Sequence, residues 1–163
     1  MKDAGIKVWV LTGDKVETAI NIGYSCRLLN NEMNQFLING TDPKEIFKQL
    51  DESIRDQALT QLLQESAAIV TGDSLLKIAA YEELKAKFLE LAEGCAVVIA
   101  CRVSPKQKAE IVQFVKFKYP RATTLSIGDG ANDVNMITAA HVGVGISGLE
   151  GQQAARSADY AIG

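Results

Sequence analysis

No stretch of this 163-residue sequence approaches the roughly 18 consecutive apolar residues that a membrane-spanning helix needs. The first ten residues alternate charged and apolar side chains, so no signal peptide is indicated. Basic clusters are also absent. The 17 Lys and Arg against 20 Asp and Glu give a formal net charge of −3, whereas nucleic-acid binding requires clustered positive charge. The chain as given is therefore expected to be soluble and not to bind nucleic acid.

Cysteine is scarce and irregularly spaced. Cys26, Cys95 and Cys101 are odd in number and do not have the spacing of a metal site, so reduced thiols in a cytosolic compartment are the simplest interpretation. No Ser/His/Asp constellation and no zinc-type Cys/His cluster is visible in the sequence. Aromatic residues make up 6% of a chain that is 47% hydrophobic, which indicates an aliphatic core large enough for one domain.

Short apolar runs alternate with segments of helical periodicity along the chain. The run from Ala96 to Cys101 is apolar throughout, as expected of a strand that is covered on both faces. The predicted strands are 6–11, 35–38, 67–70, 96–101, 123–127 and 142–146, and the predicted helices include 15–29, 75–92 and 132–140. Capping boxes at Asp42 and Ser104 predict two further helix starts. This pattern predicts an α/β fold, a Rossmann-like and mostly parallel sheet with helices on both faces.

Three polar motifs follow predicted strands. They are Thr12-Gly13-Asp14, the segment from Arg102 to Lys108, and Gly128-Asp129-Gly130-Ala131-Asn132-Asp133. In parallel sheets, ligands bind beyond the carboxyl ends of the strands. The sequence therefore predicts that the three motifs converge on one edge of the sheet and form a ligand site there.

The segment from Gly128 to Asp133 has the composition of a site for Mg²⁺ and phosphate. Mg²⁺ prefers hard oxygen ligands and usually takes one or two carboxylates from the protein, a role open to Asp129 and Asp133. The two glycines allow the backbone to approach an anion closely. Alternatively, one Asp caps a helix and the other is a surface residue, but Asn132 and both glycines would then be accidental.

Thr12-Gly13-Asp14 provides a hydroxyl donor and a glycine at the end of a predicted strand, where a phosphoryl oxygen could accept hydrogen bonds. Taken alone, an ordinary turn in which Asp14 caps the next helix is the better interpretation. The same tripeptide recurs at Thr71-Gly72-Asp73, and that copy is interpreted as structural.

Lys106 and Lys108 lie in the first turn of a predicted helix, where positive charge opposes the helix dipole at about 0.3–1 kcal/mol each. A bound anion would remove that penalty, and Arg102 could add a second cation. The alternative is a solvated helix start, which suits Lys106 better. Lys108 is therefore predicted to be the buried residue that faces phosphate.

These motifs resemble those of a known family. Thr12 to Lys15 (TGDK), Cys101 to Lys108 (CRVSPKQK) and Gly128 to Val134 (GDGANDV) are similar to the phosphorylation domain of P-type ATPases, a branch of the haloacid dehalogenase-like superfamily. The longer stretches from Ala4 to Cys26 and from Ala139 to Ile162 resemble one branch in particular, the phospholipid-translocating ATPases or lipid flippases.

The resemblance implies a role for eight residues. Thr12 would hold the phosphoryl group, and Gly13 and Asp14 would contact the nucleotide. Arg102 and Lys108 would contact both nucleotide and phosphate, and Asn132 would help to bind phosphate. Asp129 and Asp133 would hold Mg²⁺. Thr12, Lys108 and Asp129 are the catalytic residues that it implies, with Mg²⁺ as the cofactor and ATP as the substrate. These groups suit phosphoryl transfer, which depends mostly on positioning and charge stabilisation.

One departure from the family pattern is decisive. The family's nucleophile is the Asp of an Asp-Lys-Thr-Gly-Thr motif, which this sequence lacks. The resemblance therefore implies that residues 1–163 are a single phosphorylation-domain fragment, with a variable helical insert at about 30–66. The strand that carries the nucleophile, usually central to the sheet, is missing. The sheet should be incomplete, the isolated chain should form no phosphoenzyme, and an exposed gap would favour self-association.

The function implied for the parent protein is ATP-driven movement of phospholipid between membrane leaflets. The implied partners are ATP, phospholipid bound by membrane helices outside this sequence, and an accessory subunit. The implied location is a cytoplasmic domain of an integral membrane protein. The first alternative is a non-catalytic ATPase-like regulatory domain of a larger multifunctional protein. The second, a free-standing phosphatase, is disfavoured because no Asp-x-Asp motif lies near the start of the chain.

Overall fold

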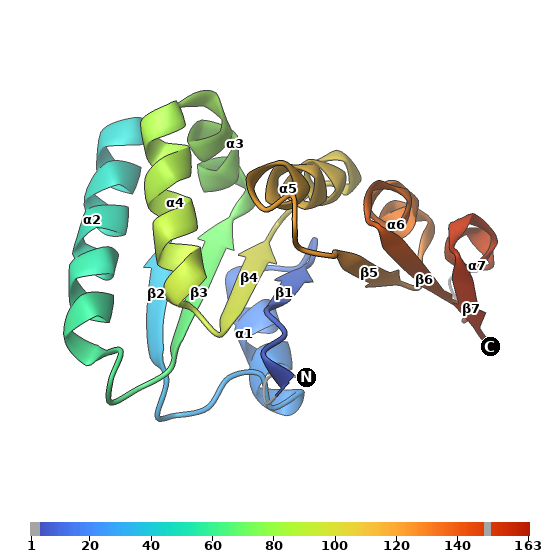
Figure 1. Cartoon of the computed structure of the whole chain (residues 1–163), viewed down its shortest axis with the longest axis horizontal. Coiled ribbons are helices and arrows are strands. Elements are labelled where there is room, and N and C mark those ends of the chain that lie inside the picture. Colours follow the sequence, from blue (N-terminus) through green and yellow to red (C-terminus); the bar gives the residue numbers. More distant parts are fainter. Residues whose placement is uncertain (1–3, 149–150) are drawn as a thin grey trace. The chain divides into compact units, whose positions relative to one another are not determined.

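The computed structural model describes residues 4–148 and 151–163. It has two compact units, Met1–Val103 and Ser104–Gly163. Each unit combines parallel strands with helices, so the predicted α/β class is confirmed (Figure 1). Within the described ranges, no helix is both long enough and apolar enough to cross a membrane. The assignment of all 163 residues to a single domain stays a prediction.

The first unit is built on a four-stranded parallel sheet. Its strands, in spatial order, are β1 (Val8–Leu11), β4 (Val97–Cys101), β3 (Ser66–Thr71) and β2 (Asn34–Ile38). All five residues of β4 are buried, as the continuous apolar run predicts. Because β1 is the neighbour of β4 at one edge, the carboxyl ends of these two strands lie side by side.

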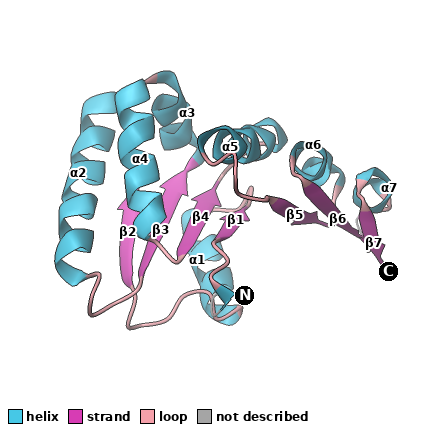
Figure 2. Cartoon of the chain, in the orientation of Figure 1, coloured by secondary structure: helices cyan, strands magenta, loops and turns pink. Residues whose placement is uncertain are grey.

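Helices cover both faces of this sheet, and the alternation of side chains along the strands separates the two faces (Figures 1 and 2). Ala19 packs in one cluster with Ile69 and Ile99 on the first face. On the opposite face, Trp9 meets Phe88 edge-to-face, with the ring centroids 6.1 Å apart. The helices are α1 (Val16–Ser25) on the first face, and α2 (Pro43–Thr60), α3 (Gly72–Ala80) and α4 (Glu82–Gly94) on the other.

The helix predicted over 75–92 is in fact two helices, α3 and α4, divided at Tyr81. The backbone of Tyr81 is extended, with φ −128° and ψ 121°. In one continuous helix, Ile78 and Leu84 would point roughly 120° apart, whereas both are buried here. The break allows each helix to turn its own apolar side to the core, and neither Gly nor Pro marks it in the sequence.

The segment at about 30–66, expected to be a variable helical insert, contains β2 and α2. Strand β2 pairs in register with β3, and Ile46 and Leu50 of α2 are completely buried. The Asp42 carboxylate accepts hydrogen bonds from Lys44 N and Glu45 N at 2.9 and 3.1 Å, so the predicted cap is confirmed. This segment is therefore an integral part of the first unit.

The second unit contains a separate three-stranded parallel sheet. The strands, in spatial order, are β5 (Leu125–Gly128), β6 (Val142–Ile146) and β7 (Tyr160–Ile162), and the helices are α5 (Pro105–Lys118), α6 (Val134–Ala139) and α7 (Gln153–Ser157). Strand β7 has only three residues, too few to give a periodic signal in the sequence. The described residues thus form two parallel sheets, where the sequence predicted one incomplete sheet that lacks its central strand.

Among the described residues of the second unit, helices α6 and α7 lie against one face of the three-stranded sheet. A Cβ added to Gly143 would lie 2.6 Å from Ile137 of α6, and one added to Gly145 would lie 2.3 Å from the Ala154 carbonyl oxygen of α7. Glycine is needed at these two positions because the helices approach the strands so closely. The predicted helices on both faces are present in the first unit.

The three thiols should differ strongly in reactivity. Cys26 is exposed, whereas Cys95 and Cys101 are buried. Burial raises the pKa of the Cys95 thiol to about 12 and that of Cys101 to about 11, and only the thiolate is nucleophilic. Labelling of the folded chain with a thiol reagent at pH 8 should modify one thiol rapidly and two only after unfolding. Rapid labelling of all three would contradict the buried positions.

The same pKa shifts set the direction of a pH dependence. Because the folded-state pKa values of Cys95 and Cys101 are raised, the neutral thiols favour the folded chain. Their contribution is fully present below the ordinary thiol pKa of about 9 and is lost as the pH rises towards 11–12. Cys95→Ala should flatten the fall in the unfolding free energy over this interval, which chemical denaturation at a series of pH values measures.

Candidate functional site

Two of the predicted motifs meet at the carboxyl edge of the four-stranded sheet. Thr12, Gly13 and Asp14 follow β1, and Arg102 follows its neighbour β4. Arg102 N donates to the Asp14 carbonyl at 3.0 Å, and Val103 N donates to the Thr12 carbonyl at 3.1 Å. The predicted proximity of these two motifs is therefore confirmed within the first unit.

The Thr12 hydroxyl closes the turn after β1. It accepts a hydrogen bond from Asp14 N and donates one to Asp14 Oδ2, both at 3.1 Å. The N-cap of α1 is Lys15, which makes no side-chain capping bond. The alternative that Asp14 caps the following helix is thus not observed, and the exposed Asp14 carboxylate stays at the carboxyl edge of β1.

Arg102 adopts a backbone conformation that is rare for a residue with a side chain. Its φ is 53°, in the left-handed region, while its side chain is exposed. Such a conformation costs about 1–3 kcal/mol and persists only when the surrounding structure holds it, here through the bond from Arg102 N to Asp14.

The second Thr-Gly-Asp copy serves the local structure. Thr71 is the N-cap of α3 and accepts a bond from Ser74 N at 3.4 Å. The buried Ser74 hydroxyl donates to the Gly40 carbonyl at 2.8 Å and so ties the helix start to the neighbouring loop. The structural interpretation of residues 71–73 fits this geometry.

In the second unit, the predicted phosphate residue and one of the predicted metal ligands form a buried ion pair. Lys108 Nζ lies 2.8 Å from Asp133 Oδ1, and the two residues are only 5% and 7% exposed. Asp133 Oδ2 also accepts hydrogen bonds from Asp129 N at 3.3 Å and Gly130 N at 3.4 Å. Asp133 therefore holds both the Lys108 ammonium group and the turn that carries Asp129.

Asp129 and Asn132 lie at the surface, at the carboxyl end of β5 and in the short 3₁₀ helix Ala131–Asp133. The Asp129 carboxylate makes no hydrogen bond with any described residue. No three His, Cys, Asp or Glu side chains of the described chain gather into a metal-binding group. Asp129 and Asp133 can offer a divalent cation one or two carboxylates from this turn, a donor set that suits Mg²⁺.

Helix α5 begins as the sequence predicts and separates its two first-turn lysines. Ser104 accepts from Gln107 N at 3.2 Å, and the Gln107 side chain accepts from Ser104 N at 3.0 Å, which completes the capping box. Lys106 is exposed and lies 3.5 Å from Glu110. The preference for Lys108 as the buried lysine is confirmed.

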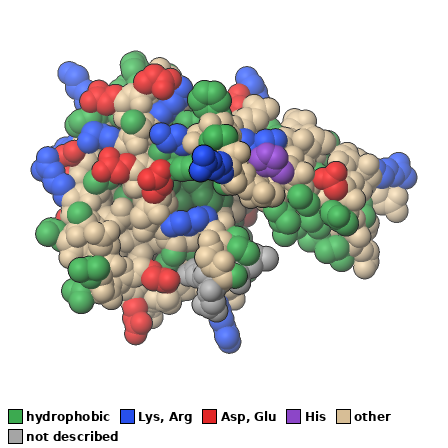
Figure 3. Space-filling view, viewed as in Figure 1, with side chains coloured by type: hydrophobic (Ala, Val, Ile, Leu, Met, Phe, Trp, Pro, Cys, Tyr) green, Lys and Arg blue, Asp and Glu red, His purple; other side chains and the backbone are tan. Residues whose placement is uncertain are grey.

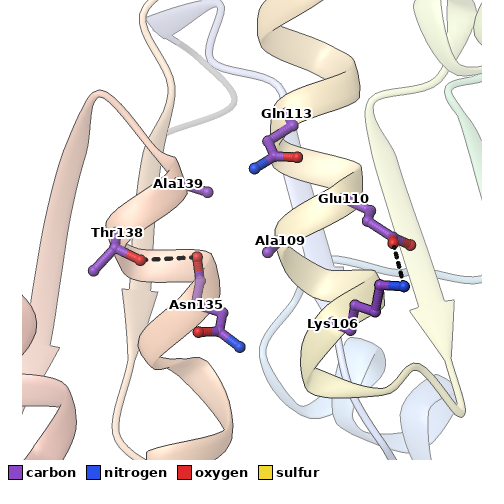
Figure 4. Close-up of a pocket in the computed structure, with 7 residues that line it drawn as sticks. All are labelled: Lys106, Ala109, Glu110, Gln113, Asn135, Thr138 and Ala139. Atoms are coloured by element: carbon purple, nitrogen blue, oxygen red, sulfur yellow. Dashed lines mark hydrogen bonds and ion pairs between the residues drawn. The ribbon is translucent and has the colours of Figure 1, made fainter.

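A shallow groove of about 420 Å³ runs between α5 and α6 (Figure 4). In the close-up, the Lys106–Glu110 ion pair lies on the side of α5 that faces away from α6. The groove is lined by Lys106, Ala109, Glu110, Gln113, Asn135, Thr138 and Ala139. Because it contains none of the eight predicted site residues, the groove is not the candidate site for phosphate chemistry.

Gly128 supports the site through its lack of a side chain. A Cβ at this position would lie 2.3 Å from Asp133 Cβ and 2.8 Å from Asp133 Oδ2. Gly128→Ala should displace Asp133 and lower the free energy of unfolding by about 1–3 kcal/mol, measured by chemical denaturation. Gly13→Ala is the matched control, because its nearest neighbour would be the Val103 carbonyl oxygen at an ordinary 3.8 Å. Equal losses in the two variants would contradict this packing.

Comparison with known proteins identifies the family to which this chain belongs. The family model described as haloacid dehalogenase-like hydrolase matches residues 6–148, most of the chain. The chain belongs to the haloacid dehalogenase-like hydrolases. All eight predicted site residues lie within residues 6–148, so they belong to the part of the chain that matches this family.

The curated relatives of this haloacid dehalogenase-like chain are lipid-transporting ATPases. It is 52% identical to the phospholipid-transporting ATPase DRS2 of Saccharomyces cerevisiae, over 100% of this chain and 12% of that protein. It is 46% identical to the probable phospholipid-transporting ATPase 11 of Arabidopsis thaliana, over 99% of this chain and 15% of that protein. The phospholipid-transporting ATPase ID of Homo sapiens is 44% identical over 98% of this chain and 15% of its own length. The resemblance seen in the motifs is confirmed, and the chain spans about an eighth of these relatives.

Proposed function

We propose that this chain is part of a phospholipid-transporting P-type ATPase. In this role it helps to transfer a phosphoryl group from ATP to an Asp outside this sequence, and the transfer drives lipid movement between leaflets. One observation carries the proposal: the exposed Asp129 carboxylate lies on a turn that the buried Lys108–Asp133 pair holds in place. The 52% identity to a phospholipid-transporting ATPase supports this choice of reaction.

Asp129 is the direct metal ligand in this proposal, because its carboxylate makes no hydrogen bond within the described chain. Mg²⁺, when bound, offsets the negative charge of the phosphoryl oxygens. Both oxygens of Asp133 already accept hydrogen bonds, so Asp133 has fewer free lone pairs to offer the cation than Asp129 has. Asp133 therefore serves first to orient Asp129 and Lys108.

Lys108 supplies fixed positive charge. An ammonium group has three N–H donors, and Asp133 takes one of them at 2.8 Å, so two are left for phosphate oxygens. Because the pair is buried, the ammonium group is oriented before a phosphate arrives, which is what electrostatic preorganisation requires. The Asn132 amide, exposed on the same turn, adds a neutral donor.

The four remaining residues bind the nucleotide and its transferred phosphate in this proposal. Thr12 provides a hydroxyl, Gly13 leaves room for close approach, and Asp14 and Arg102 lie on the exposed edge beside them. That the three polar motifs come together in one ligand site stays a prediction. ATP, phospholipid and an accessory subunit are the proposed partners of the whole protein. In the whole protein, this region is proposed to lie on the cytoplasmic side of a membrane.

The test is to graft this chain into the yeast relative in place of the matching 167-residue region, where identity is 52%. The purified graft should form a Mg²⁺-dependent, acid-stable phosphoenzyme from ATP and should move labelled phospholipid in vesicles. The isolated chain should do neither. A folded, membrane-inserted graft that forms no phosphoenzyme would instead support a non-catalytic, regulatory role, provided that the unmodified relative is active in the same preparation.

A further inference from the structure

Asn39-Gly40 is the sole Asn-Gly pair in the sequence, and it lies in the loop between β2 and α2. Asn is a thermolabile residue, and a following glycine has no side chain to shield its backbone nitrogen from the neighbouring carboxamide. Asn39 is exposed, whereas Gly40 is buried. The loop therefore presents a labile side chain to solvent, next to a backbone nitrogen that the fold holds inside.

The side-chain amide of Gln49, on α2, binds both residues of this pair. Its oxygen accepts hydrogen bonds from Gly40 N at 2.9 Å and from Asn39 N at 3.1 Å. Its nitrogen donates to Asn39 Oδ1 at 2.9 Å. One amide thus holds the Asn39 carboxamide and the Gly40 nitrogen, the two groups that deamidation would join.

Other contacts fix the backbone of Gly40 from its far side. The Ser74 hydroxyl donates to the Gly40 carbonyl at 2.8 Å. A Cβ added to Gly40 would lie 2.9 Å from the Ile46 side chain, so the loop is closely packed against α2. Rotation of the Gly40 peptide would therefore break the bonds to Gln49 and disturb the packing against Ile46 at the same time.

We propose that Asn39 is a deamidation site that the folded chain keeps unreacted, and that Gln49 is the residue that protects it. In the reaction, Gly40 N bonds to Asn39 Cγ as the Cγ–Nδ2 bond breaks. The proton of Gly40 N passes to the leaving nitrogen, which departs as ammonia. Water then opens the cyclic imide at one of its two carbonyls and leaves either Asp or isoaspartate. Ring closure requires Gly40 N to leave Gln49 and to turn towards Asn39 Cγ.

The two products should affect the chain differently. Asp adds a negative charge at an exposed position, and acidic and basic side chains are already interspersed over α2 and α4, as in the Lys48–Glu52 pair (Figure 3). Isoaspartate instead adds a carbon atom to the backbone just before Gly40, which displaces Gly40 from Ile46. Isoaspartate is therefore the damaging product. The inference concerns this chain alone and is independent of the proposed ATPase activity.

Incubation of the whole chain in mildly alkaline buffer tests the proposal. Peptide mapping by mass spectrometry measures the conversion of Asn39, and labelling with an isoaspartyl methyltransferase detects isoaspartate. Conversion should be at least about tenfold slower in the folded chain than in urea, because the three hydrogen bonds of Gln49 exist only when the chain is folded. Equal rates in the two conditions would overturn the proposal.

Two substitutions of Gln49 separate its contacts. Gln49→Leu removes all three hydrogen bonds and should accelerate conversion in the folded chain about tenfold. Gln49→Glu keeps an oxygen for the two backbone N–H groups, so its rate should stay within about twofold of the unchanged chain. Circular dichroism establishes that both variants are folded. Acceleration in neither variant, or the same acceleration in both, would contradict protection through the Gly40 N–H group.

Gln35→Leu is the matched control for a general loss of stability. Gln35 lies on β2 in the same unit, and its side chain donates to the Tyr24 hydroxyl at 2.7 Å. This variant should convert at the rate of the unchanged chain, and hydrogen exchange at Gly40 N should be faster only in Gln49→Leu. If Gln35→Leu converted as fast as Gln49→Leu, the protection would come from overall stability and the role assigned to Gln49 would be wrong.

Discussion

Lys108→Met should lower the free energy of unfolding by about 3–5 kcal/mol, the typical cost of leaving a buried charge without its partner. The Asp133 carboxylate would keep its buried position while losing a contact of 2.8 Å, and it could not be resolvated at 7% exposure. Chemical denaturation of the isolated chain, followed by circular dichroism, measures the loss. The effect should fall on the unit Ser104–Gly163, which hydrogen exchange can localise.

The ion pair also permits a double-mutant cycle. Lys108→Met combined with Asp133→Leu removes both charges, and it should recover most of the stability that either single change loses. Lys106→Met is the control, since Lys106 is exposed and its ion pair with Glu110 is of a kind that contributes about 0–1 kcal/mol. If Lys108→Met and Lys106→Met were equally mild, the buried pair would not hold the turn as described.

Asp129→Asn in the grafted ATPase should reduce Mg²⁺-dependent phosphoenzyme formation at least about 10²-fold, because the amide offers the cation no negative charge. The side chain is exposed and makes no hydrogen bond with the described chain, so the stability of the isolated chain should change by less than about 0.5 kcal/mol. The rate is measured with labelled ATP, and the stability by denaturation.

Asp73→Asn is the matched substitution in the structural Thr-Gly-Asp copy. Asp73 lies in the first turn of α3, whose start Thr71 and Ser74 hold, and no step of the proposed chemistry uses it. Phosphoenzyme formation should therefore continue unchanged. Equal losses from Asp129→Asn and Asp73→Asn would show that the assignment of the carboxylates is wrong.

Local sequence patterns correctly predicted the features that depend on interactions between residues a few positions apart. The caps at Asp42 and Ser104 are confirmed because a capping bond joins residues two or three apart. The strand 97–101 was recognisable because five consecutive apolar residues leave no polar face. The preference for Lys108 over Lys106 as the buried lysine is also confirmed.

Other features had no local signal. The break at Tyr81 exists because Ile78 and Leu84 both reach the core, and only the packed structure defines where the core lies. Lys108 and Asp133 are 25 residues apart, so the sequence assigned them separate ligands and missed their ion pair. The left-handed backbone of Arg102 depends on its bond to Asp14, 88 positions earlier in the chain.

The sequence by itself determined the α/β class, most strands and helices, the three polar motifs and the family resemblance. All of these depend on composition, periodicity or short motifs. Only the tertiary structure decided that the strands form two sheets and that Asp133 holds Lys108 and the Asp129 turn. These features depend on contacts between residues far apart in the chain, and the free energy of such contacts is set by burial and geometry, which a linear pattern does not contain.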